Sequence, residues 1–414
     1  MTAANGDSRE HPTKFSPAAL LRYFAGTPEN QEIPLIVDLP STTTVDISKK
    51  LVRLRSETGS MALTRVLTLV VVVGENDADS AIETANDASR QHPCRIIVVV
   101  IANRRGATRL DGQIRIGGDA GASEVVVLRL FGPLASHGRA VVTPLLLADA
   151  PIVAWWPTEA PKDPGADPIG EMAQRRITDV SRTTGAPRAP LARLAAAYSP
   201  GDTDLAWSRI TLWRALLTAA LDQAPFEPVT AVTVTGGTDS PSATLLAGWL
   251  SKRLRCPVTL VPSRKGTGII SVRLDRPSGP LDLVRPQNGT TATMSQAGRP
   301  ERTIALPPRS DAECLADELR RLDPDEVYAE ALRQGLDGVS HSRRTSTEAQ
   351  RKGITPSVAE SREDAARIRR ESKVSASSAM IEAPMPEKAD DPKQVKKAAA
   401  AQLETARAKR KKSS

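Results

Sequence analysis

The stretch CRIIVVVIAN, residues 94–103, decides the fold class of this protein. Successive side chains of a β-strand point to opposite faces, so an almost unbroken run of Ile and Val needs apolar cover on both faces. The run RVLTLVVVV at 65–73 has the same character, and the segment 77–91 between the two runs has a helical pattern. Two buried strands joined by a helix predict a parallel β-α-β unit.

The same alternation continues upstream of this unit. A strand is predicted at 36–39 and a helix at 45–57. Ile47, Leu51 and Leu54 recur at spacings of four and three, so they form the apolar stripe of that helix. The helix is therefore expected to pack on the sheet.

Downstream, two further strands are predicted on either side of a glycine-rich turn at 117–123. A helix is expected to begin at Pro133 and to break at Pro144, because proline fits the first helical turn but not the interior. The chain then enters a short strand that ends in two tryptophans. Strands alternating with helices in this way indicate a largely parallel sheet.

The second half of the chain predicts a second α/β unit. A long helix is expected at 201–223, and a strand at 229–237 with a helix at 240–255 begins another β-α-β unit. Four short alternating segments predict an antiparallel extension, and two helices split at Asp323-Pro324 close the fold. The predicted class is α/β, with two α/β domains, a mainly parallel first sheet, a mixed second sheet and a disordered basic C-terminal tail.

The predicted organisation has five parts. They are a flexible leader at 1–34, an N-terminal α/β domain at 35–160, a helical connecting region at 161–225, a C-terminal α/β domain at 226–335 and a tail at 336–414. The tail contains no aromatic residue. We expect it to be disordered, because such a segment cannot bury enough apolar surface to offset its ordering entropy.

The net charge of +8 is concentrated in that tail. Residues 336–414 carry 18 Lys and Arg against 11 Asp and Glu, which leaves the rest of the chain nearly neutral. A basic surface that neutralises a phosphate backbone is therefore expected only in the tail. Nucleic acid is not expected as a partner of the folded part.

The sequence also bears on the cellular compartment. Its first residues lack the basic start and apolar middle of a secretory signal, and no run of 18 uncharged apolar residues occurs, so we expect no membrane span and a cytoplasmic location. Cys94, Cys256 and Cys314 are odd in number and widely spaced. This pattern is typical of a reduced compartment, without a disulfide framework or a zinc site.

Two of the five tryptophans are adjacent in ADAPIVAWWPTEAP, residues 148–161. Neighbours on a strand point to opposite faces, so Trp155 and Trp156 cannot share their cover. Pro157 ends the strand at once, which places at least one ring near the end of an element. Two explanations stay open, namely internal cover and contact of Trp155, Trp156 and Pro157 with a ligand or a partner protein.

A glycine loop in VTVTGGTDSPSAT, residues 232–244, leads from a strand into a helix. Backbone N–H groups in such a loop favour phosphate or carboxylate, which makes Gly236, Gly237, Thr238 and Ser240 candidate anion-binding residues. The loop lacks the third glycine of a dinucleotide fingerprint and the lysine of a P-loop, and Asp239 would repel an anion. An ordinary turn is the alternative.

No catalytic set can be assembled from the sequence. Only His92 and His137 of the four histidines fall within the predicted fold, and the sequence contains no GxSxG, HExxH or Walker motif. We therefore predict that the chain is not an enzyme and that it needs no cofactor.

Several long blocks carry a family resemblance. They include LIVDLPSTTTVDISKKLVRLR, AIETANDASRQHPCRIIVVV, RIGGDAGASEVVVLRLFGPLASH, PLLLADAPIVAWWP and GDTDLAWSRITLWRALLTAALDQ. Over about residues 34–335, the chain resembles the OpcA family of glucose-6-phosphate dehydrogenase assembly proteins of actinobacteria. The leader and the long basic tail depart from the compact pattern of that family.

The resemblance implies a non-catalytic cytoplasmic protein that binds glucose-6-phosphate dehydrogenase, promotes its oligomeric assembly and raises its activity in the oxidative pentose phosphate pathway. Two alternatives stay open. One is a sensor or enzyme that binds a sugar phosphate or a nucleotide at the loop of Gly236 and Gly237. The other is a protein that binds nucleic acid or an acidic partner through its tail.

Overall fold

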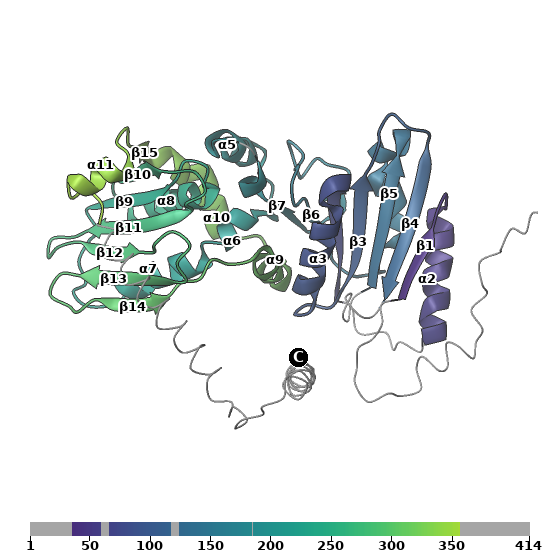
Figure 1. The fold of residues 1–414 in the computed structure, drawn as a ribbon, viewed down its shortest axis with the longest axis horizontal. Coiled ribbons are helices and arrows are strands. Elements are labelled where there is room, and N and C mark those ends of the chain that lie inside the picture. Colours follow the sequence, from purple (N-terminus) through teal and green to yellow (C-terminus); the bar gives the residue numbers. More distant parts are fainter. Residues whose placement is uncertain (1–34, 59–65, 117–123, 184, 357–414) are drawn as a thin grey trace, which may run out of the picture. The chain divides into compact units, whose positions relative to one another are not determined.

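The structure is a computed structural model that describes residues 35–58, 66–116, 124–183 and 185–356. The predicted leader at 1–34, the turn at 117–123 and residues 357–414 of the predicted tail lie outside the described residues. The described residues form two mixed sheets with helices (Figure 1). The predicted α/β class with two sheets is confirmed.

The first sheet has eight strands in the order β1-β4-β5-β3-β2-β6-β7-β8. β4 runs antiparallel to β1 and β5, and all other neighbours are parallel. The strands are β1 Leu35–Leu39, β2 Leu67–Gly74, β3 Cys94–Ile101, β4 Arg109–Ile116, β5 Glu124–Phe131, β6 Ile152–Trp155, β7 Arg175–Thr178 and β8 Asp202–Asp204. The stretch that begins at Cys94 is therefore a central strand, and it is buried through Val100.

Helices cover both faces of this sheet. On one face, α2 (Thr44–Thr58) buries Ile47, Leu51 and Leu54, as the apolar stripe predicts. On the other face, the short turn η1 (Glu75–Asp77) leads into α3 (Ala78–Ser89), which packs against α9 (Asp311–Arg320). Figure 1 shows α2 and α3 on opposite sides of the sheet. Residues 311–320, which come late in the chain, therefore help to cover this face of the first sheet.

The helix predicted from Pro133 is broken more often than expected. It consists of three short turns, η3 (Gly132–Ser136), α4 (Gly138–Val142) and η4 (Thr143–Leu145). Pro133 and Pro144 each lie at the start of a turn, where the missing N–H group costs no hydrogen bond. The prediction of one continuous helix up to Pro144 is therefore wrong.

The connecting region predicted at 161–225 contributes two strands to the first sheet. β7 and β8 are short, and their sequences RRIT and DTD carry charged residues in place of an apolar pattern. Because β8 occupies 202–204, the single helix predicted at 201–223 is wrong at its start. The remaining elements are η5 Gly170–Met172, η6 Val180–Arg182, α5 Arg188–Ala197, α6 Leu205–Ser208 and α7 Thr211–Leu221.

The second sheet has seven strands in the order β14-β13-β12-β11-β9-β10-β15. β9, β10 and β15 are parallel, and the strands from β11 to β14 extend the sheet in antiparallel fashion, as predicted. The strands are β9 Ala231–Gly237, β10 Val258–Ser263, β11 Ile269–Asp275, β12 Leu281–Val284, β13 Thr291–Gln296, β14 Arg302–Ala305 and β15 Val339–His341. The predicted β-α-β unit that begins with β9 and ends with β10 is confirmed.

Residues 336–356, which the composition placed in the tail, belong to the folded part. β15 pairs with β10, and the helix after it also packs on β10. The composition gave no signal because a three-residue edge strand needs backbone hydrogen bonds rather than an apolar sequence. The helical elements here are α8 Pro241–Leu254, α10 Glu326–Glu330, η7 Ala331–Gly335, η8 Leu336–Gly338 and α11 Ser346–Arg351.

Glycine lets α8 approach the turn η7 closely. A Cβ atom on Gly335 would lie 2.1 Å from the carbonyl oxygen of Gly248, far inside van der Waals contact. The two backbones can therefore meet only where both residues lack a side chain.

Buried apolar side chains of the described residues form three clusters. Two lie on the two faces of the first sheet, and the third joins the second sheet to α7 and α8. None of the helices in the described part of the chain is long and apolar enough to cross a membrane.

Candidate functional sites at the carboxyl edges of the two sheets

The connections of the first sheet diverge at β2. From β2 the chain passes through α3 to β3 on one side, and it later returns from β5 to place β6 on the other side. In open α/β sheets, ligands bind at the carboxyl ends of strands where connections diverge in this way. The carboxyl edge beside β2 is therefore the candidate ligand position of this sheet.

A pocket of about 590 Å³ opens at this edge. Its lining combines apolar side chains such as Ile101 and Trp156 with Arg104, Arg139 and Glu159. The Nη1 atom of Arg139 donates a hydrogen bond of 2.7 Å to a carboxylate oxygen of Glu171. The volume lies within the range of roughly 300–1,000 Å³ that small-ligand sites occupy. Because basic and acidic side chains both line the pocket, it offers hydrogen-bond partners to anionic and to cationic groups of a ligand.

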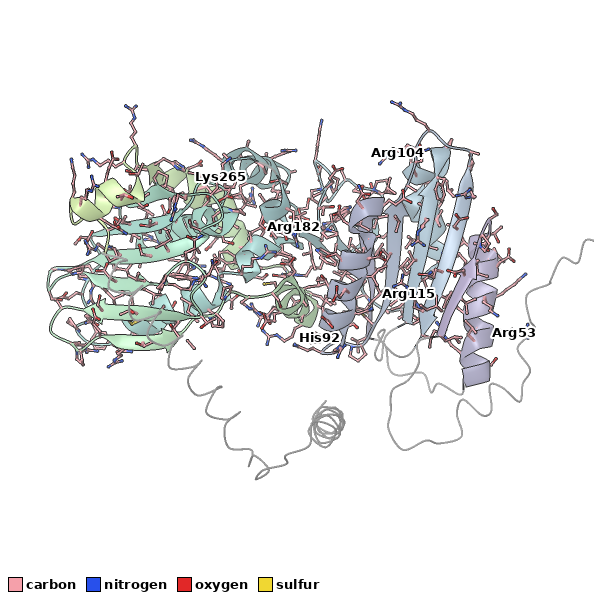
Figure 2. All side chains as sticks on the ribbon, in the orientation of Figure 1. Arg53, His92, Arg104, Arg115, Arg182 and Lys265 are labelled. Carbon is pink, nitrogen blue, oxygen red and sulfur yellow. The ribbon has the colours of Figure 1, made fainter. Side chains whose placement is uncertain are left out.

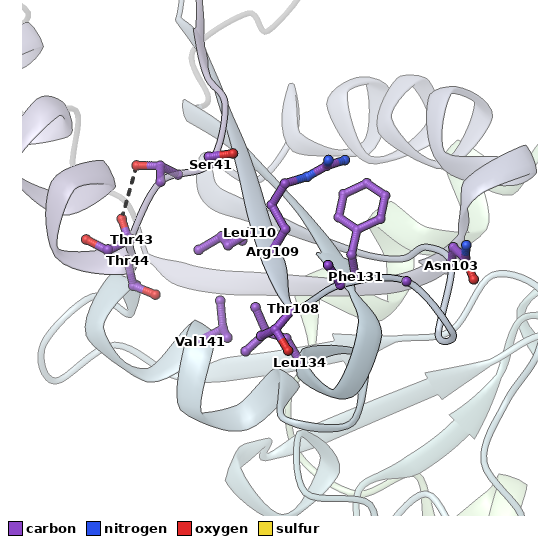
Figure 3. A pocket seen from close by; sticks show the side chains of 13 residues that line it. Ser41, Thr43, Thr44, Asn103, Thr108, Arg109, Leu110, Phe131, Leu134 and Val141 are labelled. Atoms are coloured by element: carbon purple, nitrogen blue, oxygen red, sulfur yellow. Dashed lines mark hydrogen bonds between the residues drawn. The ribbon is translucent and has the colours of Figure 1, made fainter.

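A second pocket, of about 730 Å³, lies at the carboxyl ends of β1, β3 and β5 (Figure 3). Hydroxyl groups of residues 41–44 and Thr108 line it. The guanidinium carbon of Arg109 lies 4.1 Å from the centre of the Phe131 ring, and its Nε atom lies 3.1 Å from the Asp111 carboxylate. The Thr43 hydroxyl donates a hydrogen bond of 2.7 Å to the Asp46 carboxylate, and the N–H group of Ser41 donates to the Asp111 carboxylate at 2.9 Å, so two carboxylates adjoin this lining.

Trp155 and Trp156 lie on opposite faces of the first sheet, as the strand geometry predicts. Trp155 joins the cluster that contains α3 and α9, and Trp156 joins the cluster that contains α2. Each residue is only 2% exposed, and Pro157 is buried as well. The structure thus gives both rings internal cover. Contact of Trp155, Trp156 and Pro157 with a partner stays a prediction, and Trp156 also lines the pocket of about 590 Å³.

The glycine loop lies at the carboxyl end of β9, and its backbone is tied to the turn before β11. The N–H groups of Gly237 and Thr238 donate to the carbonyl oxygens of Gly268 and Ser263, at 2.8 and 3.3 Å. The Ser240 hydroxyl caps α8 by accepting from the N–H group of Ala243.

Each glycine of this loop also has a packing role. A Cβ atom on Gly236 would lie 2.5 Å from the Cβ atom of Ala243, and one on Gly237 would lie 2.9 Å from the Asp239 carboxylate. That carboxylate in turn accepts from the N–H group of Gly266. Because these groups already have partners inside the protein, the structure favours the ordinary turn. Anion binding by Gly236, Gly237, Thr238 and Ser240 stays a prediction.

The carboxyl edge of β9, β10 and β15 carries a group of exposed cations. Arg264 and Lys265 follow β10, and Arg343 and Arg344 follow β15. We call these four residues the basic rim; Lys265 is labelled in Figure 2. The sequence placed Arg343 and Arg344 in the tail, so it could not show that two distant segments bring these cations to one edge.

Buried ion pairs connect α9 to the first sheet. The Nε atom of Arg175, on β7, donates a hydrogen bond of 3.0 Å to Glu318, on α9. Arg175 is 3% exposed and Glu318 is 5% exposed. The Ser208 hydroxyl donates to the other carboxylate oxygen of Glu318, and Arg175 also donates to the carbonyl oxygen of Asp323. Charges so deeply buried need such partners to offset their desolvation.

A second set of ion pairs surrounds the start of α9. Arg209 donates to Asp179 at 2.7 Å and to Asp311 at 2.6 Å, and Arg182 donates to Asp311 at 2.6 Å. Burial would raise the pKa of Asp311, but its hydrogen bonds and charge interactions with Arg209 and Arg182 outweigh burial and lower it. Asp311 is therefore held ionised, which fixes the first turn of α9 against η6.

Asp204 is a buried carboxyl group whose hydrogen-bond donors are a hydroxyl and backbone N–H groups. It accepts from the Thr178 hydroxyl at 2.6 Å and from the N–H groups of Val180 and Ala206, at 3.0 and 2.9 Å. Burial, together with the negative charge of Asp179, raises the pKa of Asp204 to about 7. This carboxyl group therefore titrates near neutral pH in the folded protein.

The raised pKa predicts how stability depends on pH. Folded Asp204 binds a proton more tightly than the unfolded chain does, so its contribution is fully present below about pH 4 and is lost as pH rises through about 7. Wild-type protein should lose on the order of a few kcal/mol of unfolding free energy from this group between pH 5 and 8. Urea titrations at several pH values measure it. Asp204→Asn should flatten this slope, and parallel slopes in the two proteins would contradict the assignment.

Burial disfavours the thiolate form at two of the three cysteines. Burial raises the pKa of Cys314 to about 12 and also raises the pKa of Cys256, while Cys94 is buried at the start of β3. A thiol with a raised pKa is a poor nucleophile at neutral pH. In the described part of the chain, no group of three or more His, Cys, Asp or Glu is placed to hold a metal ion.

Two family models match consecutive parts of the chain. The N-terminal domain of a glucose-6-phosphate dehydrogenase subunit, in the OpcA assembly family, matches residues 85–196. The C-terminal domain of the same subunit matches residues 200–332. No curated protein matches the sequence. Since the two models follow each other in order and together cover more than half of the sequence, the chain belongs to the OpcA family of glucose-6-phosphate dehydrogenase assembly proteins.

Proposed function

We propose that this protein is a non-catalytic assembly factor and allosteric activator of glucose-6-phosphate dehydrogenase. In this role it promotes the active oligomer of the enzyme in the oxidative pentose phosphate pathway, and it works in the cytoplasm with its partner. The two family models, which together describe a subunit of that dehydrogenase, carry the proposal.

The ion pairs of α9 support this role, because they join the two parts of the chain that the family models match. α9 lies within the match to the C-terminal domain, whereas its partners Arg175 and α3 lie within or overlap the match to the N-terminal domain. The two matched parts are therefore joined by buried contacts rather than by the chain alone. A partner that binds one matched part would therefore bind a protein in which buried contacts hold the other matched part in place.

The mechanism that fits this role is thermodynamic linkage. An activator shifts a population only if it binds the active oligomer of the enzyme more tightly than the dissociated or weakly active form. A difference of roughly 1–3 kcal/mol changes the ratio of the two forms about 5- to 150-fold. The protein needs no catalytic group for this, because the chemistry stays in the dehydrogenase.

Kinetics and size-exclusion chromatography together test the proposal. Activity of the same organism's dehydrogenase is measured against glucose 6-phosphate concentration, with and without this protein, and the mixture is run on a sizing column. We expect co-elution with a lower KM or a higher kcat. Separate elution with unchanged kinetics would reject the assembly function, whereas co-elution with unchanged kinetics would reject activation alone.

A further inference from the structure

The basic rim consists of Arg264, Lys265, Arg343 and Arg344, and the second sheet brings these residues together. β10 and β15 pair in parallel, with Val258 opposite Val339 and Leu260 opposite His341. The N–H group of Ser342 continues the ladder by donating to the carbonyl oxygen of Leu260 at 2.9 Å. Because both strands run in the same direction, the turns that follow them emerge at the same edge of the sheet. The two pairs of cations are thus neighbours, although about eighty residues separate them.

Further contacts hold the two turns in place. The Ser346 hydroxyl, at the start of α11, donates to the Ser263 hydroxyl at 3.4 Å, and α11 packs on β10. The turn after β10 is tied to the loop after β9, since the N–H group of Gly266 donates to Asp239 at 3.0 Å. Hydrogen bonds therefore hold both turns that carry the rim residues.

The charges of the rim are exposed and are not neutralised within the described residues. All four side chains are exposed, and no ion pair to any of them occurs in the described part of the chain. Two carboxylates lie nearby, Asp239, which accepts from Gly266, and Glu348, which caps α11 by accepting from Thr345, so the four cations outnumber them. Hydrogen bonds from Thr345, with smaller contributions from Lys352 and Arg344, lower the pKa of Glu348. The edge thus keeps a net positive charge.

The chemistry of this edge fits an acidic protein surface better than a nucleic acid. A phosphate backbone requires an extended series of cations, whereas this rim is compact and has two carboxylates within it. Protein interfaces commonly combine complementary charge with such local exceptions, which fix the register of the partner. Arg264 and Lys265 lie within the family match, whereas Arg343 and Arg344 lie beyond residue 332, where that match ends.

We propose that the basic rim is a docking surface for a cluster of carboxylates on the partner dehydrogenase. The inference rests on the proposed function, since it names part of the surface through which that function would work. Charge attraction across such a surface speeds association and is weakened by salt. The rim therefore contributes mainly to the rate of complex formation at low ionic strength.

Charge reversal tests the rim. The full chain and the double variants R343E/R344E and R264E/K265E are immobilised, and binding of the same organism's glucose-6-phosphate dehydrogenase is followed at about 50 mM and about 500 mM NaCl. We expect each variant to bind roughly 10-fold more weakly or worse at low salt, mainly through slower association, with the difference shrinking at high salt. Circular dichroism shows whether each variant keeps its fold.

The matched control is R188E/R193E on α5, which changes the same number of charges at two exposed positions that are not part of the rim. It should bind as the wild type does. Equal binding of wild type and rim variants at both salt concentrations would overturn the inference while leaving the assembly function intact. Loss of binding by wild type itself would reject the proposed function, and the inference with it. Loss of duplex DNA retention in the rim variants, with enzyme binding unchanged, would assign the rim to nucleic acid instead.

Discussion

Glu318→Gln is expected to lower the free energy of unfolding by about 3–5 kcal/mol, measured by urea denaturation at neutral pH. The substitution keeps the size of the side chain but removes its charge. It leaves the Arg175 guanidinium, which is 3% exposed, without its counter-ion, and it weakens the hydrogen bond from the Ser208 hydroxyl. A buried charge that has lost its partner is far more costly than an intact pair is stabilising.

Asp317→Asn provides the matched control, because it changes the neighbouring residue of the same helix in the same way. Asp317 pairs with Arg309 at 2.7 Å, but it remains partly exposed to water. We expect a loss below about 1 kcal/mol there. If the two substitutions had equal effects, the Arg175–Glu318 pair would not be the contact that holds α9 to the first sheet.

Trp155→Ala and Trp156→Ala are each expected to destabilise the protein by about 3–5 kcal/mol, because each removes a large buried ring from one face of the first sheet. A smaller change separates the two sites. The Nε1 atom of Trp155 is buried and has no hydrogen-bond partner among the described residues. Trp155→Phe should therefore destabilise the protein less than its loss of buried ring area alone predicts, since the substitution also removes an unsatisfied donor.

Phe226→Ala is the control for these substitutions, because Phe226 is 80% exposed. It should change stability by no more than about 0.5 kcal/mol. Thermal and urea unfolding, combined with binding of the dehydrogenase, distinguish core from interface. Tryptophan variants that keep full stability but lose the partner would restore direct contact as the role of this pair.

The sequence predicted the parts of the fold whose signal is local. The Ile- and Val-rich stretch from Cys94 to Ile101 forms a central strand, and the stripe of Ile47, Leu51 and Leu54 faces the sheet. Alternation along a strand also predicted that Trp155 and Trp156 point to opposite faces. These features follow from the periodicity of the backbone, which a short segment already carries.

Features that depend on distant partners were missed. β7 and β8 read as connecting chain because Arg175, Arg176 and Asp202 do not resemble residues of a buried strand. They are buried because other segments supply their counter-charges and hydrogen bonds. The glycine loop also depends on distant partners. Its composition left an anion site and an ordinary turn open, and only the structure shows that Gly268 and Ser263 accept from the N–H groups of Gly237 and Thr238.

The α/β class, the main strands and helices, and the family could be predicted from the sequence, since they depend on local periodicity and on residues in a recognisable order. Three features became visible only in the fold. Both tryptophans are covered, α9 returns to the first sheet through buried ion pairs, and Arg264, Lys265, Arg343 and Arg344 share one edge. Burial and charge neutralisation each depend on residues that are distant in the sequence, so the segment that contains one partner does not identify the other.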